Sequence, residues 1–102
     1  MVSLFAALIL VSAGGHAAET TTKTVSIDGS KFQPAALTVK QGDTVVWNNS
    51  DPFPHTATAK GGEFDSKQIA PNGTWKFTAK KKGEFPYSCT IHPAMKGTLV
   101  VK

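Results

Sequence analysis

Residues 44–49 of the chain read TVVWNN, and this stretch decides the fold. Val45 and Trp47 are apolar at alternate positions, the spacing that places side chains on one face of a β-strand. The same alternation recurs on either side, in residues 24–27 (TVSI), 37–39 (LTV), 74–79 (TWKFTA) and 84–87 (EFPY). The sequence therefore predicts an all-β protein, a Greek-key β-sandwich of about seven or eight strands.

Turn-forming residues separate the expected strands. They occur at 28–29 (DG), 41–43 (QGD), 61–62 (GG) and 71–73 (PNG), and the two prolines of 50–54 indicate a loop. Residues 32–34 (FQP) are expected to be irregular, because proline cannot donate to a central strand ladder. Residues 19–23 (ETTTK) are expected to be a disordered tail.

Composition limits both the size of the protein and its chemistry. A chain of 102 residues with 40% hydrophobic and 18% charged side chains is one globular domain at most. The single cysteine excludes an intramolecular disulfide framework and a cysteine-rich zinc site. Eleven lysines against seven acidic residues give a net charge of +4 without any arginine. Nucleic acid is not an expected partner, because basic and aromatic residues are not interleaved.

The N-terminal stretch is predicted to be a signal peptide, residues 1–18, followed by the folded domain, residues 19–102. The apolar run 4–11 (LFAALILV) is eight residues long, too short to cross a bilayer, and small residues follow it. A short buried core helix or strand is the alternative interpretation of this run. Export to the periplasm is the expected outcome, with no membrane insertion of the mature chain.

Residues 87–95 (YSCTIHPAM) carry the side chains with metal chemistry. A histidine follows the cysteine by three positions and a methionine follows the histidine by three, so a tight loop between strands could bring all three together. Thiolate, imidazole and thioether groups suit copper, whereas a thioether is a poor zinc ligand. His55, 34 residues before Cys89, is the other histidine of the mature chain. The candidate metal ligands are therefore His55, Cys89, His92 and Met95.

The sequence resembles the blue (type 1) copper cupredoxins of the plastocyanin, pseudoazurin and amicyanin group, and amicyanin most of all. The resemblance extends over about residues 25–101, and its motifs are FQP (32–34), GDTVVW (42–47), PH (54–55) and the ligand loop ending MKG (95–97). It implies one copper ion per chain, bound by the four candidate ligands. Ile91 stands where amicyanin has proline, and Ala94 where it has a bulky aromatic residue. Asn49 resembles the family asparagine that ties the two ligand loops together, by bonding near Thr90.

These observations predict a monomeric periplasmic carrier of single electrons and not an enzyme. A redox donor and a redox acceptor are expected to dock near His92, where an apolar cap and a rim of lysines would meet them. The cap would comprise Pro52, Phe53, Pro54, Ile91, Pro93 and Ala94, and the rim Lys60, Lys67, Lys80, Lys81, Lys82 and Lys96. Two alternatives are a copper-binding or copper-delivery protein without a redox partner, and a metal-free structural sandwich.

Overall fold

The computed structural model describes residues 19–102, which form eight β-strands and contain no helix. The predicted signal peptide, residues 1–18, lies outside the described residues. Along the chain the strands are β1 (Thr22–Ile27), β2 (Phe32–Gln33), β3 (Ala36–Val39), β4 (Thr44–Asn49), β5 (Thr58–Ala59), β6 (Thr74–Thr78), β7 (Gly83–Ser88) and β8 (Lys96–Val101). None of the described residues forms a helix that could span a bilayer.

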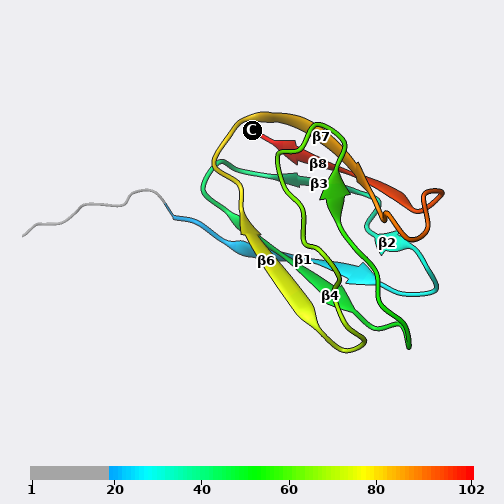
Figure 1. The fold of residues 1–102 in the computed structure, drawn as a ribbon. Coiled ribbons are helices and arrows are strands. Elements are labelled where there is room, and N and C mark those ends of the chain that lie inside the picture. Colours follow the sequence, from blue (N-terminus) through cyan, green and yellow to red (C-terminus); the bar gives the residue numbers. More distant parts are fainter. Residues whose placement is uncertain (1–18) are drawn as a thin grey trace, which may run out of the picture.

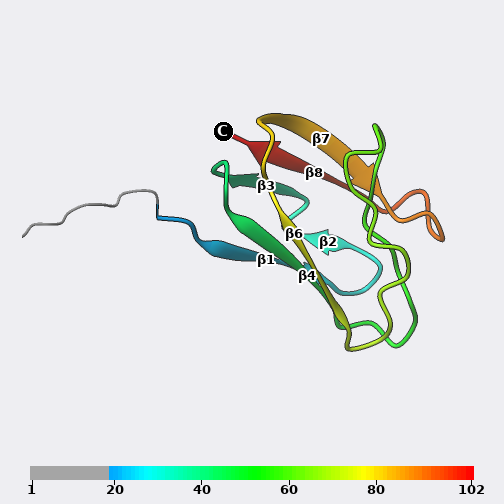
Figure 2. The same cartoon turned by 60° about the vertical axis from the view of Figure 1, so that its left-hand side comes forward.

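Two four-stranded sheets make the layers of a sandwich (Figure 1). The first has the order β2-β1-β4-β6 and the second the order β3-β8-β7-β5. Strands β1 and β4 are parallel, as are β3 and β8, and the other pairs are antiparallel. The chain thus crosses repeatedly between the sheets, which confirms the predicted all-β sandwich (Figure 2).

The core lies between the sheets and is built by the alternation seen in the sequence. In β4 the side chains of Val45 and Trp47 are fully buried, and in β7 those of Phe85 and Tyr87 are buried. Trp47 is central, with its ring 5.5 Å from that of Tyr87 in an edge-to-face arrangement. Burial raises the pKa of Tyr87 to about 12. The core leaves no room for a side chain at Gly97 in β8, because a Cβ there would lie 2.5 Å from Cζ of Tyr87.

Two sequence predictions are corrected by the strands. The expected disordered tail, residues 19–23, instead enters β1 at Thr22, and the amide of Thr21 donates to Oδ1 of Asp43 at 2.9 Å. The expected irregular stretch 32–34 contains β2, a two-residue strand on the edge of its sheet. Pro34 follows this strand, so its missing N–H interrupts no ladder.

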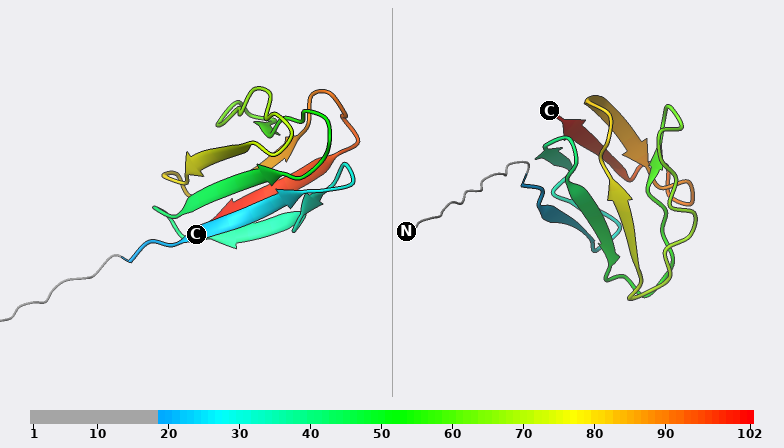
Figure 3. Two further views of the ribbon diagram at one scale, coloured as in Figure 1. Left: turned by 90° about the horizontal axis from the view of Figure 1, so that it is seen from below. Right: turned by 90° about the vertical axis from the view of Figure 1, so that its left-hand side faces the viewer.

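The two ends of the sandwich are chemically different. The chain enters at one end, where the turn before β4 meets the C-terminal residue: the amide of Gln41 donates to the carbonyl of Lys102 at 2.9 Å. The loop from β7 to β8, drawn in orange, lies at the other end, together with the segment that follows β4 (Figures 1 and 3). This second end carries the predicted metal ligands.

Candidate metal centre

Main-chain pairing holds three of the candidate ligands in the interior. The buried positions of β7 are Phe85 and Tyr87, and Cys89 continues the same spacing and is 0% exposed. Met95 precedes β8 and is likewise buried. His55 is 0% exposed and is held by a two-bond bridge to Ile69, with N···O distances of 3.2 and 2.7 Å. Each of these side chains is fixed by main-chain pairing.

The structure brings His55, Cys89 and His92 together. One potential ligand atom from each lies within 4.8 Å of the others. Nδ1 of His55 is 3.7 Å from Sγ of Cys89, and the two imidazole rings have centroids 5.3 Å apart. Metal bonds of about 2.0 Å to imidazole and about 2.3 Å to thiolate, the lengths of zinc sites, allow atoms at this separation to share one ion. His92 is exposed, so the cluster reaches the surface through one ring.

Met95 closes the loop that carries Cys89 and His92. The amide of Cys89 donates to the carbonyl of Met95 at 3.1 Å, and the amide of Met95 donates to the carbonyl of His92 at 2.9 Å. These two bonds fold the seven residues 89–95 into a compact turn. The fourth candidate is therefore a buried thioether attached to the same turn as the thiolate and the exposed imidazole.

His55 is oriented by a carboxylate that the sequence reasoning missed. Its Nε2 lies 2.7 Å from Oδ2 of Asp51, which leaves Nδ1 facing Cys89. We assign the ring proton to Nε2, because only then does His55 donate to the carboxylate and keep Nδ1 free for a metal. Asp51 also accepts from the amides of Gly29 at 2.7 Å and Ser30 at 2.9 Å. The only sequence signal was an acidic residue four positions before a histidine.

The pKa of Asp51 is set by two opposing effects. Burial acts to raise it, while the amides of Ser30 and Gly29 and the imidazole of His55 act to lower it, and the pKa ends below its ordinary value. Asp51 is therefore an anion at neutral pH. A histidine that donates one ring proton to a carboxylate has a fixed tautomer and a more basic second nitrogen.

The thiol of Cys89 has a main-chain donor of its own. The amide of Thr56 lies 3.2 Å from Sγ, on the segment that carries His55. Oγ1 of Thr56 also accepts from the amide of Thr90 at 2.9 Å. One residue therefore joins the His55 segment to the Cys89 turn through both its main chain and its side chain. Sequence reasoning missed Thr56, which offered only its position beside a candidate ligand.

Asn49 has a tying role, but with partners other than those expected. Its Nδ2 donates to the carbonyls of Phe53 at 2.9 Å and Ile69 at 3.0 Å, and its Oδ1 accepts from the amide of Asp51 at 3.0 Å. The expected bond near Thr90 is corrected, because Thr56 makes that contact. Asn49 instead fixes residues 51–53, which lead to His55, and Ile69, which pairs with His55.

Two members of the predicted apolar cap, Phe53 and Ile91, lie open to solvent near His92 in space or in sequence. Phe53 and Ile91 are 43% and 42% exposed, the large apolar side chains most open to solvent among the described residues. The Phe53 ring lies 5.2 Å from the ring of His55 and 6.0 Å from that of His92. It therefore covers the buried imidazole and borders the exposed one.

The expected rim of six lysines is only partly formed. Lys80, Lys81 and Lys82 lie in the turn between β6 and β7, at the end opposite to the metal cluster, and are removed from the rim (Figure 1). Lys67 pairs with Asp65, with Nζ 3.5 Å from Oδ2. Lys96 directly follows Met95, and Lys60 lies beside β7, where its amide donates to the carbonyl of Pro86 at 2.8 Å.

Fold and site together define a class: β-sandwich proteins that bind one redox-active metal between two loops at one end. The family profile described as a cupredoxin-like domain matches residues 1–101. The chain belongs to the cupredoxin family, and its cluster of two imidazoles and a thiolate suits one copper ion.

Relatives of known name agree with this placement. The chain is 32% identical over 83 residues to amicyanin-alpha of Methylorubrum extorquens, covering 76% of this chain and 70% of that one. It is 30% identical to the amicyanin of Paracoccus versutus, again over 76% of this chain but only 63% of the relative's length. A solved structure described as a reduced Cu(I) form of an amicyanin variant at pH 4 superposes with a TM-score of 0.72 at 30% identity, covering 78% of this chain and 80% of that chain.

Proposed function

We propose that this protein is a type 1 copper protein that carries single electrons between redox partners, with His55, Cys89, His92 and Met95 as the ligands. The observation that supports it most is the meeting of three potential ligand atoms within 4.8 Å, from segments 34 residues apart in sequence. Met95 would supply the fourth and weakest donor in this assignment. Bound copper supplies one-electron chemistry between its Cu(I) and Cu(II) states.

The protein's own contribution is to hold the ligands still and keep water away. His55 and Cys89 are fully buried and Met95 nearly so. Asp51 holds the ring of His55 through Nε2, and the amide of Thr56 donates to Sγ of Cys89. A site whose ligands are positioned by packing changes little when the metal changes charge. This buried arrangement favours electron transfer over binding a substrate at the metal, so we infer that the protein is not an enzyme.

The exposed edge of His92 is the proposed point of electron entry and exit. The apolar surface with Phe53 and Ile91 surrounds it, and such a patch on a small protein is a docking surface for a partner. Redox proteins are the proposed partners, in keeping with the amicyanin relatives, and the carrier is proposed to act as a monomer. We also propose that residues 1–18 direct export and that the domain 19–102 works in the periplasm.

The visible spectrum of the purified protein with one equivalent of Cu(II) tests this function. An intense blue thiolate-to-copper band that vanishes on reduction is expected, because only a copper thiolate gives that absorption. A colourless Cu(II) complex would refute the assignment. Adding a chelator then separates carrier from delivery protein: rapid electron self-exchange with slow copper loss supports the carrier, and facile transfer of copper to the chelator contradicts it.

A further inference from the structure

The residue whose amide binds the Cys89 sulfur, Thr56, has a hydroxyl group that is completely used. Its Oγ1 lies 3.0 Å from Oγ1 of Thr58 and 3.3 Å from Oγ1 of Thr90, and it accepts from the Thr90 amide at 2.9 Å. A hydroxyl has one proton to donate and two lone pairs with which to accept, so these three contacts fill it. The neighbours of Thr56 therefore decide which way its proton points.

A carboxylate at the end of this row of hydroxyls fixes the direction of every bond. Oγ1 of Thr58 donates to Oδ1 of Asp65 at 3.1 Å, because an ionised carboxylate can only accept. The amide of Lys67, 2.9 Å from the same oxygen, does most to hold the pKa of Asp65 below its ordinary value. Thr58 has no second proton, so Thr56 donates to Thr58, and Thr90 donates to Thr56 for the same reason. The hydroxyl chain runs in one direction, from Thr90 through Thr56 and Thr58 to Asp65.

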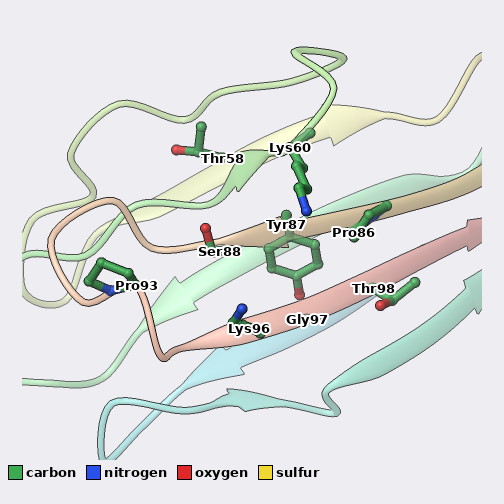
Figure 4. A pocket seen from close by; sticks show the side chains of 10 residues that line it. Thr58, Lys60, Pro86, Tyr87, Ser88, Pro93, Lys96, Gly97 and Thr98 are labelled. Atoms are coloured by element: carbon green, nitrogen blue, oxygen red, sulfur yellow. The ribbon is translucent and has the colours of Figure 1, made fainter.

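Strand pairing brings the residues of the hydroxyl chain together. Thr58 pairs with Ser88 of β7 and forms an isolated bridge with Asp65 on its other side. Figure 4 shows the side chain of Thr58 beside the strand that carries Ser88, with its hydroxyl turned away from Lys60. The Asp65 side chain is 42% exposed and Thr56 is only 4% exposed, so the hydroxyl chain leads from solvent to a buried residue.

The acceptor at Asp65 strengthens the link between the two ligand segments. Without it, the hydroxyl of Thr58 is free to donate to Thr56, and the order of the hydroxyl chain is no longer fixed. With it, the oxygen of Thr56 accepts both bonds from Thr90, and its own donation toward Asp65 makes that oxygen a better acceptor. Thr56 and Thr90 adjoin His55 and Cys89 in sequence, so this link also fixes where the Thr56 amide meets the sulfur.

We propose that Asp65 and Thr58 are positioning residues of the metal centre, which hold the amide of Thr56 on the sulfur of Cys89 through the hydroxyl chain. The inference rests on the proposed function for the metal, and on contacts within the protein for the positioning. Hydrogen bonding around the cysteine sulfur is one of the means by which the potential of a copper-thiolate site is tuned. An N–H donor withdraws electron density from the thiolate and so disfavours Cu(II). Weakening this donor should therefore lower the reduction potential.

Hydrogen exchange in the metal-free protein tests the positioning without any contribution from copper. Thr58→Val removes the hydroxyl but keeps a β-branched side chain and the charge of Asp65. The amides of Thr56 and Thr90 should exchange about two- to tenfold faster, as expected when a hydrogen bond of about 0.5–1.5 kcal/mol is lost. Amides of β4 should exchange as in the parent protein. Unchanged protection of Thr56 and Thr90, or faster exchange throughout β4 as well, would overturn the proposal.

The matched control is Thr98→Val. Thr98 is half-buried like Thr58 and lies on the same sheet, in β8, but takes no part in the hydroxyl chain. This variant should leave the amides of Thr56 and Thr90 as protected as in the parent protein. Faster exchange of these amides in the control, equal to that in Thr58→Val, would show that any such substitution on the sheet has the effect and would refute a specific role for Thr58.

Two neutral variants of Asp65 separate the acceptor from the charge. Asp65→Asn keeps an oxygen that can accept from Thr58 and from the amide of Lys67, whereas Asp65→Ala has none. The asparagine variant should restore the slow exchange of Thr56 that the alanine variant loses. With copper bound, Asp65→Ala should have a lower reduction potential than Asp65→Asn, and Thr58→Val a lower potential than the parent protein. Equal potentials within both pairs would overturn the proposal. A protein that binds no copper, or gives no blue band, would instead refute the proposed function and leave the exchange test standing.

Discussion

Asn49 offers the sharpest test of how the scaffold holds the metal-ligand loops. Its side chain is 0% exposed, and its three shortest hydrogen bonds run to the carbonyls of Phe53 and Ile69 and from the amide of Asp51. A fourth, longer bond of 3.4 Å runs to the carbonyl of Ala70. Asn49→Ala removes the three short bonds at once. Two carbonyls and one amide would then lose their buried partner.

The expected loss of stability follows from these contacts. A typical internal hydrogen bond contributes about 1 kcal/mol net, and a buried group left without a partner costs about 1–3 kcal/mol. Three bonds therefore give a loss of about 3 kcal/mol in the free energy of unfolding. Domains of this size are stable by about 5–15 kcal/mol, so the loss is a large share of the total. At about 4–8 °C per kcal/mol, the midpoint of thermal unfolding should fall by about 12–24 °C.

Urea unfolding of the metal-free protein measures this loss without any contribution from copper binding. Asn48→Ala is the matched control, because Asn48 is the neighbouring residue of β4 and its side chain is exposed. The control should differ from the parent protein by about 0.5 kcal/mol or less. If Asn49→Ala is no less stable than Asn48→Ala, the three bonds do not hold the loop and the reasoning fails.

Three further predictions concern the ligands and a buried carboxylate. Cys89→Ser should fold normally but lose the blue band, because a hydroxyl cannot replace the thiolate; a blue serine variant would disprove the ligand assignment. Met95→Leu should retain copper and show a higher reduction potential by voltammetry, since the axial bond is weak; complete loss of copper would argue against an axial role. The amides of Thr21 and Lys40 hold the pKa of Asp43 below its ordinary value of 3.8. The ionised carboxylate therefore stabilises the folded protein above pH 3.8, and this stabilisation is lost as the pH falls through the pKa of the folded state. Asp43→Asn should therefore lower the urea midpoint of the metal-free protein at neutral pH and narrow its difference from the parent in acid; a constant difference would contradict this linkage.

The part of the site that sequence could predict is the part encoded locally. Alternation through Phe85 and Tyr87 continues to Cys89, so the inward direction of the thiol follows from a short stretch of chain. The positions of His92 and Met95 could be predicted in the same way, because both residues lie in the single turn that follows Cys89. The fold class was predictable for the same reason, because period-two alternation with turn residues between the runs is a local signal.

The contacts that orient the ligands depend on register and could not be predicted in this way. Thr56 meets Cys89 and Thr90 across 33 and 34 residues, and only the pairing of Thr58 with Ser88 brings these stretches side by side. The tail before β1 was expected to be disordered for a similar reason: Thr21 is held by a carboxylate 22 residues away. A sequence pattern states which face a residue occupies, but not which residue of another strand lies opposite.

The distribution of these contacts explains how a small domain can hold a metal site without a disulfide. His55 and Cys89 come from separate segments, and three connections limit their relative motion: the amide of Thr56 on the sulfur, the hydroxyl of Thr56 on Thr90, and the pairing of β5 with β7. Asp51 adds a fourth connection, because it holds the ring of His55 and is itself held by the turn after β1. Moving either ligand therefore requires breaking bonds that belong to the sandwich itself. The rigidity that one-electron transfer needs is thus a property of how the sheets pair, and it is present in the protein before any metal binds.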